Sequence, residues 1–166
     1  MANIQALNNT NLNVETGKNI VINFSFAGKP KSILKAPLMI RSVDETTIKT
    51  TFPNTVNIDF YKDSIHIESK LFAKYGYFLE NDNTVYFKDS VVCFNNLGDT
   101  LWSDEITWDA KKEKFHSEKK VKLKQHSPFS NIDAIGFESD RNLANIIFFK
   151  IQKNSFFTIN DSLTLK

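Results

Sequence analysis

The sequence contains few of the residues that punctuate or cross-link a chain. Its 166 residues include five glycines, four prolines and a single cysteine, Cys93. A lone cysteine excludes an intramolecular disulfide but does not identify the compartment. The printed sequence has no run of about 18 apolar residues that would span a bilayer as a helix, and its first residues lack the regions of a signal peptide. Two locations therefore stay open: the cytoplasm, or an envelope compartment if an anchor precedes these residues.

Charge of one sign is also not in excess. Lys and Arg number 21 and Asp and Glu number 19, for a net charge of +2, which does not favour a nucleic-acid partner. Aromatic residues, in contrast, are plentiful, with 15 Phe, 4 Tyr and 2 Trp. Aromatic and β-branched residues favour pleated, half-buried surfaces, so the composition indicates strands. The simplest interpretation is an aromatic core, and the alternative is an apolar interior with room for a ligand.

Apolar and polar residues alternate along much of the chain. The pattern is clearest in four segments: 20–26, 56–61, 65–68 and 120–124. In the first of these, Phe24 and Phe26 share one face with Ile20 and Ile22. A period of two residues predicts strands with one apolar and one polar face.

Turn-forming residues separate these strands at short intervals. Asn, Asp, Gly and Pro gather in six places: 27–30, 62–63, 81–83, 95–99, 109–112 and 127–128. Such residues accept or fix unusual φ angles and end strands in hairpins. A weak internal repeat supports stacked hairpins, because a shift of 35 residues places Val56 on Val91 and Ile58 on Cys93. We expect an all-β fold with two facing antiparallel sheets, and at most one helical turn, at 140–145.

The expected domain organisation is simple. Residues 1–18 are polar and rich in Asn and Thr, which predicts a flexible lead-in. Residues 19–166 are enough for one domain with its own core. Within the tail at 155–166, apolar residues such as Phe156 and Phe157 predict one additional strand.

Several motifs follow one another in a distinctive order. Residues 91–109 contain an apolar strand, an Asn and Gly turn, a Leu, an acidic pair and a closing Trp-Asp step. A strand ending in Lys-Lys-Val follows at 114–121, and Ile-Gly-Phe-Glu-Ser-Asp follows at 135–140. Earlier in the chain, Leu-Lys-Ala-Pro at 34–37 precedes a Phe-Pro step and the strand 56–61. The ordered set is more specific than any one of its members.

Over residues 20–151 this order resembles the LptC branch of the LptA and LptC family of lipopolysaccharide export proteins. The resemblance implies a twisted antiparallel β-jelly roll, open along one edge, that binds lipid acyl chains between its two sheets. One departure is Ala134, where the family usually has the first Gly of a Gly-x-Gly element. The loss of that glycine affects local backbone geometry more than function.

The resemblance also implies a role. It is that of a non-enzymatic carrier, without a cofactor, that accepts lipopolysaccharide from an inner-membrane ABC transporter and passes it to an LptA-like bridge protein. Partners would join by edge-strand pairing, for which the free edges of an open β fold are templates. The implied location is the periplasm, with a tether to the inner membrane through an N-terminal anchor that precedes the printed residues.

The candidate ligand-binding residues are large and apolar and lie on the predicted apolar strand faces. They are Phe24, Phe26, Leu34, Ile58, Phe60, Ile67, Leu71, Phe87, Trp108, Phe115, Phe137 and Phe148. For any single member, packing in the core is the simpler role. Basic residues that could meet lipid phosphates at the rim, or simply form a solvated face, are Lys29, Lys31, Lys35, Arg41, Lys119, Lys120, Lys122 and Lys124.

A carbohydrate-binding β-sandwich at the cell surface is the alternative function. Trp102, with Tyr75 or Tyr77, would then form the sugar platform. Which face of each strand lines a cleft stays open at this point, because a register slip of one residue exchanges the two faces.

An enzyme on a β scaffold is a third possibility, but no motif supports it. No Gly-x-Ser-x-Gly elbow is present. The acidic residues at 104, 105 and 109 could suggest a glycosidase pair, although they fit the polar face of a hairpin more simply. His66, His116 and His126 do not have the spacing of metal ligands. We therefore expect no catalytic residue and no metal site.

Overall fold

The computed structural model of the chain describes residues 13–26 and 28–158. This part of the chain forms one antiparallel sheet of 11 strands and a single short 3-10 helix, η1 (Glu80–Asp82). The strands are β1 (Asn13–Phe26), β2 (Lys29–Val43), β3 (Ile48–Phe52), β4 (Val56–Tyr61), β5 (Ile67–Ala73), β6 (Tyr75–Leu79), β7 (Thr84–Asn95), β8 (Thr100–Asp109), β9 (Lys114–Gln125), β10 (Ser130–Asp140) and β11 (Ile146–Ile151).

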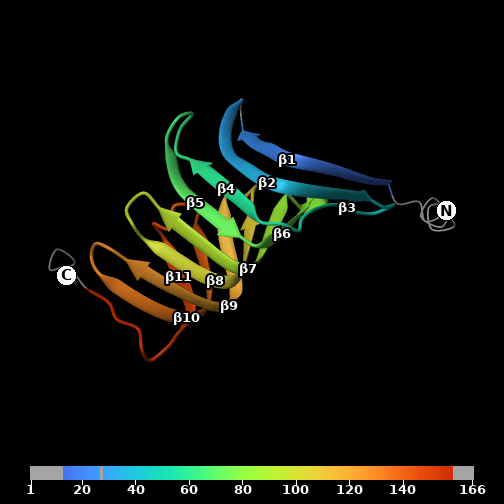
Figure 1. Ribbon diagram of the computed structural model, residues 1–166. Coiled ribbons are helices and arrows are strands. Elements are labelled where there is room, and N and C mark those ends of the chain that lie inside the picture. Colours follow the sequence, from blue (N-terminus) through green and yellow to red (C-terminus); the bar gives the residue numbers. More distant parts are fainter. Residues whose placement is uncertain (1–12, 27, 159–166) are drawn as a thin grey trace.

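The sheet is a meander of long strands. β3 and β4 lie end to end along β2, and β6 and β5 lie end to end along β7. β3 also pairs with β6, and β4 pairs with β5. β3 and β4 together therefore occupy the place of one long, interrupted strand, and so do β6 and β5. β1 and β11 are at opposite ends of the sheet (Figure 1).

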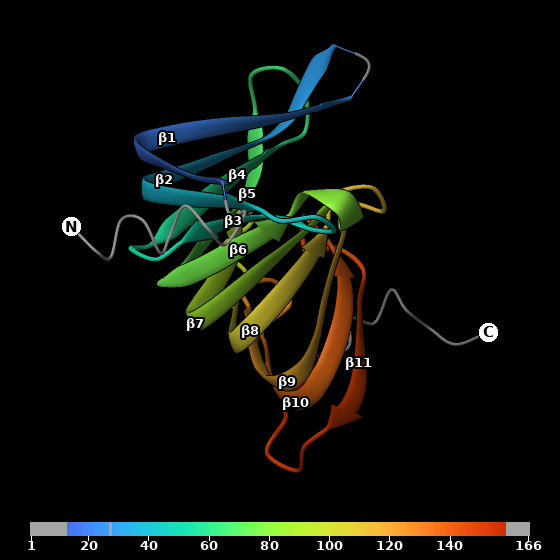
Figure 2. The same ribbon diagram turned by 90° about the vertical axis from the view of Figure 1, so that its right-hand side faces the viewer.

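A line of backbone irregularities crosses the sheet near the middle of the long strands. Residues with a positive φ along it are Asn19, Thr55, Asp89, Ser90 and Gly136. The pairing register also shifts there, between 88 and 91 in β7, between 103 and 107 in β8 and between 135 and 137 in β10. Bulges bend a strand and increase its twist. The aligned irregularities, which we call the fold line, therefore bend the whole sheet, and Figure 2 shows the curved strands.

The fold line divides the sheet into two layers. Layer A contains β3, β6 and the residues at 13–18, 38–43, 84–88, 105–109, 114–118, 137–140 and 146–149. Layer B contains β4, β5 and the residues at 20–26, 29–36, 91–95, 100–103, 120–125, 130–135 and 150–151. Apolar side chains of the two layers face each other and form one core.

Aromatic rings join the layers at the centre of this core. Phe60 of layer B contacts Trp108 and Phe115 of layer A, with ring centroids 5.0 and 5.3 Å apart. Phe24 of layer B contacts Trp108 and Phe78 of layer A at 5.2 and 5.4 Å. All four pairs are edge-to-face, the arrangement that aromatic quadrupoles favour, and each such pair contributes about 0.5–1.5 kcal/mol beyond its buried area.

The predicted fold class is confirmed: the chain is an antiparallel, open β-jelly roll. The two facing sheets are halves of one folded sheet, and the six predicted turn regions all separate strands. In the segment 140–145, where one helical turn was allowed, Asp140 ends β10 and residues 141–145 form turns and bends.

Two boundaries differ from the expectation. Residues 13–18, predicted as flexible lead-in, belong to β1, because they pair with 38–43 of β2. Residues 1–12 lie outside the described part of the chain. In the tail, Phe156 makes an isolated bridge to Asn131, so residues up to 158 do not form the additional strand that was expected. Residues 159–166 again lie outside the described residues.

Gly136 on the fold line provides a test of this architecture. Its φ is +80°, and an added Cβ would lie 2.5 Å from Phe149 Cδ2 and 3.3 Å from Phe149 Cβ. Gly28 has a similar φ of +76° with no atom within 4 Å of an added Cβ. We expect Gly28→Ala to lower the free energy of unfolding by about 1 kcal/mol, because alanine disfavours a positive φ. Gly136→Ala should lose about 1–3 kcal/mol more than Gly28→Ala, because its added Cβ overpacks against Phe149.

Urea denaturation measures both variants. Phe149→Ala should restore most of the overpacking loss in the Gly136→Ala background. Equal losses for Gly136→Ala and Gly28→Ala would contradict the close approach of Phe149 to the fold line.

Candidate ligand-binding site between the layers

The predicted lining residues converge on the interior between the layers. Eight of the twelve are at most 1% exposed: Leu34, Ile58, Phe60, Leu71, Phe87, Trp108, Phe115 and Phe137. Phe24 and Phe148 are half-buried and pack against this core, and Ile67 is half-buried at the start of β5. The side chain of Phe26 lies outside the described residues. Whether the set contacts a ligand stays a prediction.

The prediction missed several equally buried neighbours. Phe52, Leu101, Ile106 and Leu123 are all at most 1% exposed and belong to the same core. Leu123 lies on the alternating apolar face of 120–124, so the period of two was sufficient to find it. Ile106 follows the register shift in β8, which reverses the parity of the buried positions and hides the pattern.

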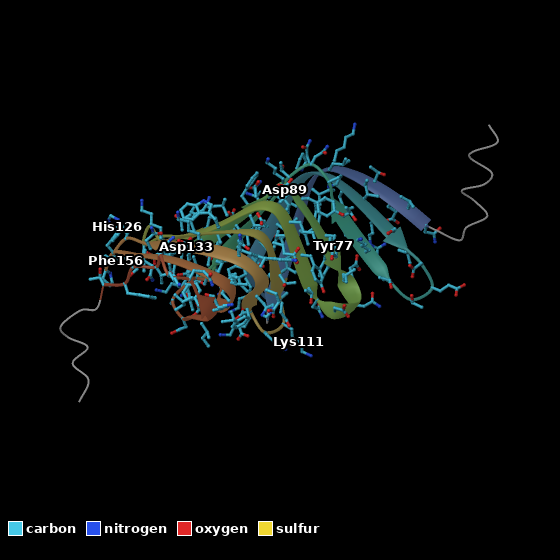
Figure 3. The ribbon with its side chains drawn as sticks, turned by 90° about the horizontal axis from the view of Figure 1, so that it is seen from below. Tyr77, Asp89, Lys111, His126, Asp133 and Phe156 are labelled. Atoms are coloured by element: carbon cyan, nitrogen blue, oxygen red, sulfur yellow. The ribbon has the colours of Figure 1, made fainter. Side chains whose placement is uncertain are left out.

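A groove opens next to β1, between the strand ends of layer A and those of layer B. It has a volume of about 600 Å³, within the range of small-molecule pockets. Its lining residues are Asn23, Phe24, Ser25, Lys31, Ser32, Asn83, Trp108, Ala110, Lys111 and Glu113. Figure 3 shows Lys111, which lines the groove, and Asp89, which lies on the fold line, on opposite sides of the molecule. The groove therefore faces away from the fold line.

Arg141, in the loop between β10 and β11, ties the two layers together on this open side. Its guanidinium donates to Glu68 Oε1 at 2.7 Å and to the Tyr61 carbonyl at 2.8 Å, both at the ends of layer B strands. It also donates to the Lys31 carbonyl at 3.3 Å and to Glu113 Oε1 at 3.2 Å. The side chain is 11% exposed and that of Glu68 is 13% exposed. We call this set of contacts the Arg141 clasp.

The neighbours of Arg141 extend the clasp. Ser69 Oγ donates to the Arg141 carbonyl, and Asn95 Nδ2 donates to the Asn142 carbonyl at 3.0 Å. Leu143 is 1% exposed and joins the core. The loop thereby covers the interior at the ends of β5 and β7. Sequence reasoning missed Arg141, because its partner Glu68 is 73 residues away in the chain.

The predicted basic rim is dispersed. Of its members, Lys31 lines the groove, and Lys111, which was not predicted, lies there too. Arg41 instead pairs with Glu80 at 2.8 Å, and Lys35 is 3.8 Å from Asp59. The Lys residues at 119, 120, 122 and 124 are exposed on β9 and are not among the residues that line the groove. The side chain of Lys29 is not among those described.

Trp102 and Tyr77, one of the two aromatic pairs predicted for the alternative sugar platform, do not lie together. Trp102 is 38% exposed on the outer face of β8 in layer B. Tyr77 is in layer A, where it stacks on Tyr86 with centroids 4.6 Å apart. Tyr86 pairs with Thr107, five residues from Trp102 along β8, which corresponds to about 17 Å.

Asp63 and His66 form a local hydrogen-bonded pair between β4 and β5. Asp63 accepts hydrogen bonds from the backbone N–H of Ile65 and from His66, which lower the pKa of its carboxyl to about 2. His66 lies in the segment between β4 and β5, whereas a strand was predicted there. Burial raises the pKa of the Cys93 thiol, which keeps it protonated and unreactive. Within residues 13–26 and 28–158, no three His, Cys, Asp or Glu side chains gather as a metal site would require.

The fold and the site define a class: an open β-jelly roll with an apolar interior closed on one side by a polar clasp. The family described as lipopolysaccharide-assembly, LptC-related, matches residues 9–147. The chain therefore belongs to the LptC-related family, which confirms the resemblance seen in the ordered motifs. No curated protein matches the chain.

Membership places the chain in lipopolysaccharide transport and cell-envelope biogenesis. The family comprises transport and binding components that are periplasmic and associated with the inner membrane, and its partners are lipopolysaccharide and other proteins of the transport system. In the described part of the chain, no helix is long and apolar enough to cross a membrane.

The clasp yields a prediction about opening of the interior. Arg141→Met keeps the apolar stem but leaves Glu68 and two backbone carbonyls without their donor. We expect the free energy of unfolding to fall by about 2 kcal/mol or more, somewhat less than for a fully buried ion pair. We also expect faster labelling of Cys93, the only cysteine, by a maleimide under native conditions, because separated layers expose the interior.

Arg41→Met is the matched control. Arg41 also pairs with a glutamate, Glu80, but its side chain is 29% exposed. Both residues belong to layer A or to η1, which follows β6, so this pair does not join the two layers. Its loss should cost under about 1 kcal/mol and should leave Cys93 labelling unchanged. Equal labelling rates in both variants would contradict the assignment of Arg141 as the residue that holds the layers together.

Proposed function

We propose that this chain is a non-enzymatic carrier that holds the acyl chains of lipopolysaccharide between layers A and B. In this proposal it accepts the lipid from an inner-membrane ABC transporter and passes it to an LptA-like bridge protein. An anchor N-terminal to the printed residues would tether it to the inner membrane. The energy for release comes from the upstream transporter, so the carrier itself needs no catalytic group.

The observation that carries the proposal is a continuous apolar interior whose open side is closed at the rim by the polar contacts of the Arg141 clasp. The core faces of both layers are lined by aliphatic and aromatic side chains such as Leu71, Ile58 and Phe115. Transfer of an acyl chain from water into such surroundings is favourable by about 0.8 kcal/mol per methylene. Chains that separate the layers must break the Arg141 clasp, whose contacts are hydrogen bonds and ion pairs that water can replace.

The two ends of the sheet suit the proposed partners. Within the described residues, β1 pairs only with β2 and β11 only with β10, so each has a free edge. Free edges are templates for strand addition. The β11 end also exposes large apolar side chains, with Ile147 at 65%, Phe149 at 48% and Ile151 at 47%. By analogy with the family, the β1 edge would meet the transporter and the β11 edge the bridge protein.

Site-specific photocrosslinking tests the carrier function. A benzophenone amino acid at Phe24 or Phe148 tolerates insertion best, because both side chains are half-buried at the margin of the core. A probe at Phe60 reports on the centre. We expect ultraviolet light to yield lipopolysaccharide adducts at these three positions in cells, detected by a mobility shift and an antibody against lipopolysaccharide.

Phe94 is the matched control, since it is 40% exposed on the outer face of β7 and should yield no adduct. A probe at Trp102 tests the carbohydrate-binding alternative. Adducts with soluble glycans at Trp102, together with no lipopolysaccharide adduct at any of the three inward positions, would overturn the carrier proposal.

A further inference from the structure

Two buried polar groups at the groove have no hydrogen-bond partner. Among the described residues, Ser32 Oγ and Trp108 Nε1 are both shielded from water and unpartnered, and both residues line the groove next to β1. Ser32 is 0% exposed and Trp108 is 1% exposed. Leaving a buried donor unpaired is costly for a fold, so such groups in a native protein call for an explanation.

Other buried hydroxyls of the same core are satisfied. Ser69 Oγ donates to the Arg141 carbonyl, Ser103 Oγ to the Glu105 carbonyl at 3.0 Å, and Ser139 Oγ to the Asp140 carbonyl at 2.8 Å. A third unpartnered atom among the described residues, Asn131 Oδ1, lies on β10 and does not line the groove. Of the three, the two that can donate a hydrogen bond are therefore both at the groove.

The surroundings of these groups favour one kind of occupant. An indole N–H can only donate, so its partner must bring an acceptor oxygen. The ring of Trp108 contacts Phe24 on its groove side and Phe60 on its core side, so the path inward is apolar. Lys31 and Lys111 lie at the groove and can face an anionic group, whereas Glu113, which also lines it, is 3.2 Å from Arg141.

We propose that the groove binds the carbonyl-bearing segment of an anionic acyl lipid, with Trp108 Nε1 and Ser32 Oγ donating hydrogen bonds to ester or amide oxygens. The inference rests on the proposed carrier function and adds the part of the lipid that is recognised. The acyl chain beyond the carbonyl extends past Trp108 towards Phe60 and Phe115, and the anionic headgroup lies near Lys31 and Lys111.

Phe24 controls access to these donors. It is half-buried, lies on the terminal strand β1 and packs edge-to-face on Trp108. A ligand that displaces the Phe24 ring reaches the indole and replaces an aromatic contact with an apolar chain and a hydrogen bond. Only β2 holds β1 in the sheet within the described residues, so a shift of Phe24 needs no change in the rest of the core.

A pair of lipids that differ only in the carbonyl tests the inference. Acyl lysophosphatidylglycerol carries an ester carbonyl, and its alkyl ether analogue has the same chain and anionic headgroup without that oxygen. We expect the protein to bind the ester lipid about five- to tenfold more tightly, as one or two net hydrogen bonds allow. Isothermal titration calorimetry measures both affinities below the critical micelle concentration.

The variants Ser32→Ala and Trp108→Phe should each reduce the preference for the ester towards unity. Ser139→Ala and Trp102→Phe are the matched controls, since Ser139 already has an acceptor and Trp102 lies on the outer face. Both controls should keep the preference. Trp102→Phe also leaves Trp108 as the only tryptophan, so its emission should change on addition of the ester lipid. Slow Cys93 labelling verifies that each variant is folded. If Trp108→Phe does not fold, the ester preference of Ser32→Ala alone decides the test.

The outcomes separate this inference from the carrier function. Equal affinities of the parent protein for ester and ether lipids overturn the carbonyl site and leave the carrier function in place. If neither lysolipid binds, titration with lipid A decides: an affinity that Ser32→Ala and Trp108→Phe leave unchanged again overturns the site. Absence of lipid A binding by the parent protein contradicts the carrier function itself.

Discussion

The structure depends on one constraint: a sheet with a continuous apolar face must bury that face, and this sheet buries it against itself. The long strands cross from layer A to layer B at the fold line, where positive φ angles at Thr55, Asp89, Ser90 and Gly136 and shifts in register bend the sheet. Both layers thus belong to one meander of hairpins. Within the described residues, the interior is enclosed by strand backbone at the fold line and by loops and side chains on the opposite side, which can open without breaking the sheet.

Two kinds of contact close that open side. The edge-to-face rings of Phe60, Trp108 and Phe115 join the layers in the centre, and the Arg141 clasp joins them at the rim. Burial of aromatic rings is the larger contribution to stability, whereas the clasp gives the closed state a defined geometry. In the proposed carrier function, an acyl chain would replace aromatic packing with apolar packing of its own, so the main loss on opening would be the polar contacts of the clasp.

Much of the fold could be predicted from local patterns. Alternation at 56–61 and 120–124 correctly assigned the buried faces, and the turn-forming residues marked the hairpins. The weak repeat of 35 residues also has a structural origin, because the chain leaves the fold line at Thr55, passes through β4, β5, β6 and the first part of β7, and returns to the fold line at Ser90. The start of β1 was missed because residues 13–18 are mostly polar and owe their strand conformation to pairing with β2. Ile106 escaped detection because a bulge changes the parity of β8.

The sequence by itself determined the class of fold, the identity of a central part of the core, including Phe60, Trp108 and Phe115, and, through the order of its motifs, the family. These properties follow from periodicity and local turn chemistry, which act over a few residues. Only the tertiary structure decided which charges meet, since Arg141 reaches Glu68 over 73 residues of chain and Lys119 to Lys124 do not line the groove. It also decided that Ser32 and Trp108 share a groove with their polar groups unpaired. Such pairings depend on how a sheet bends and closes, and no local pattern in a strand records that.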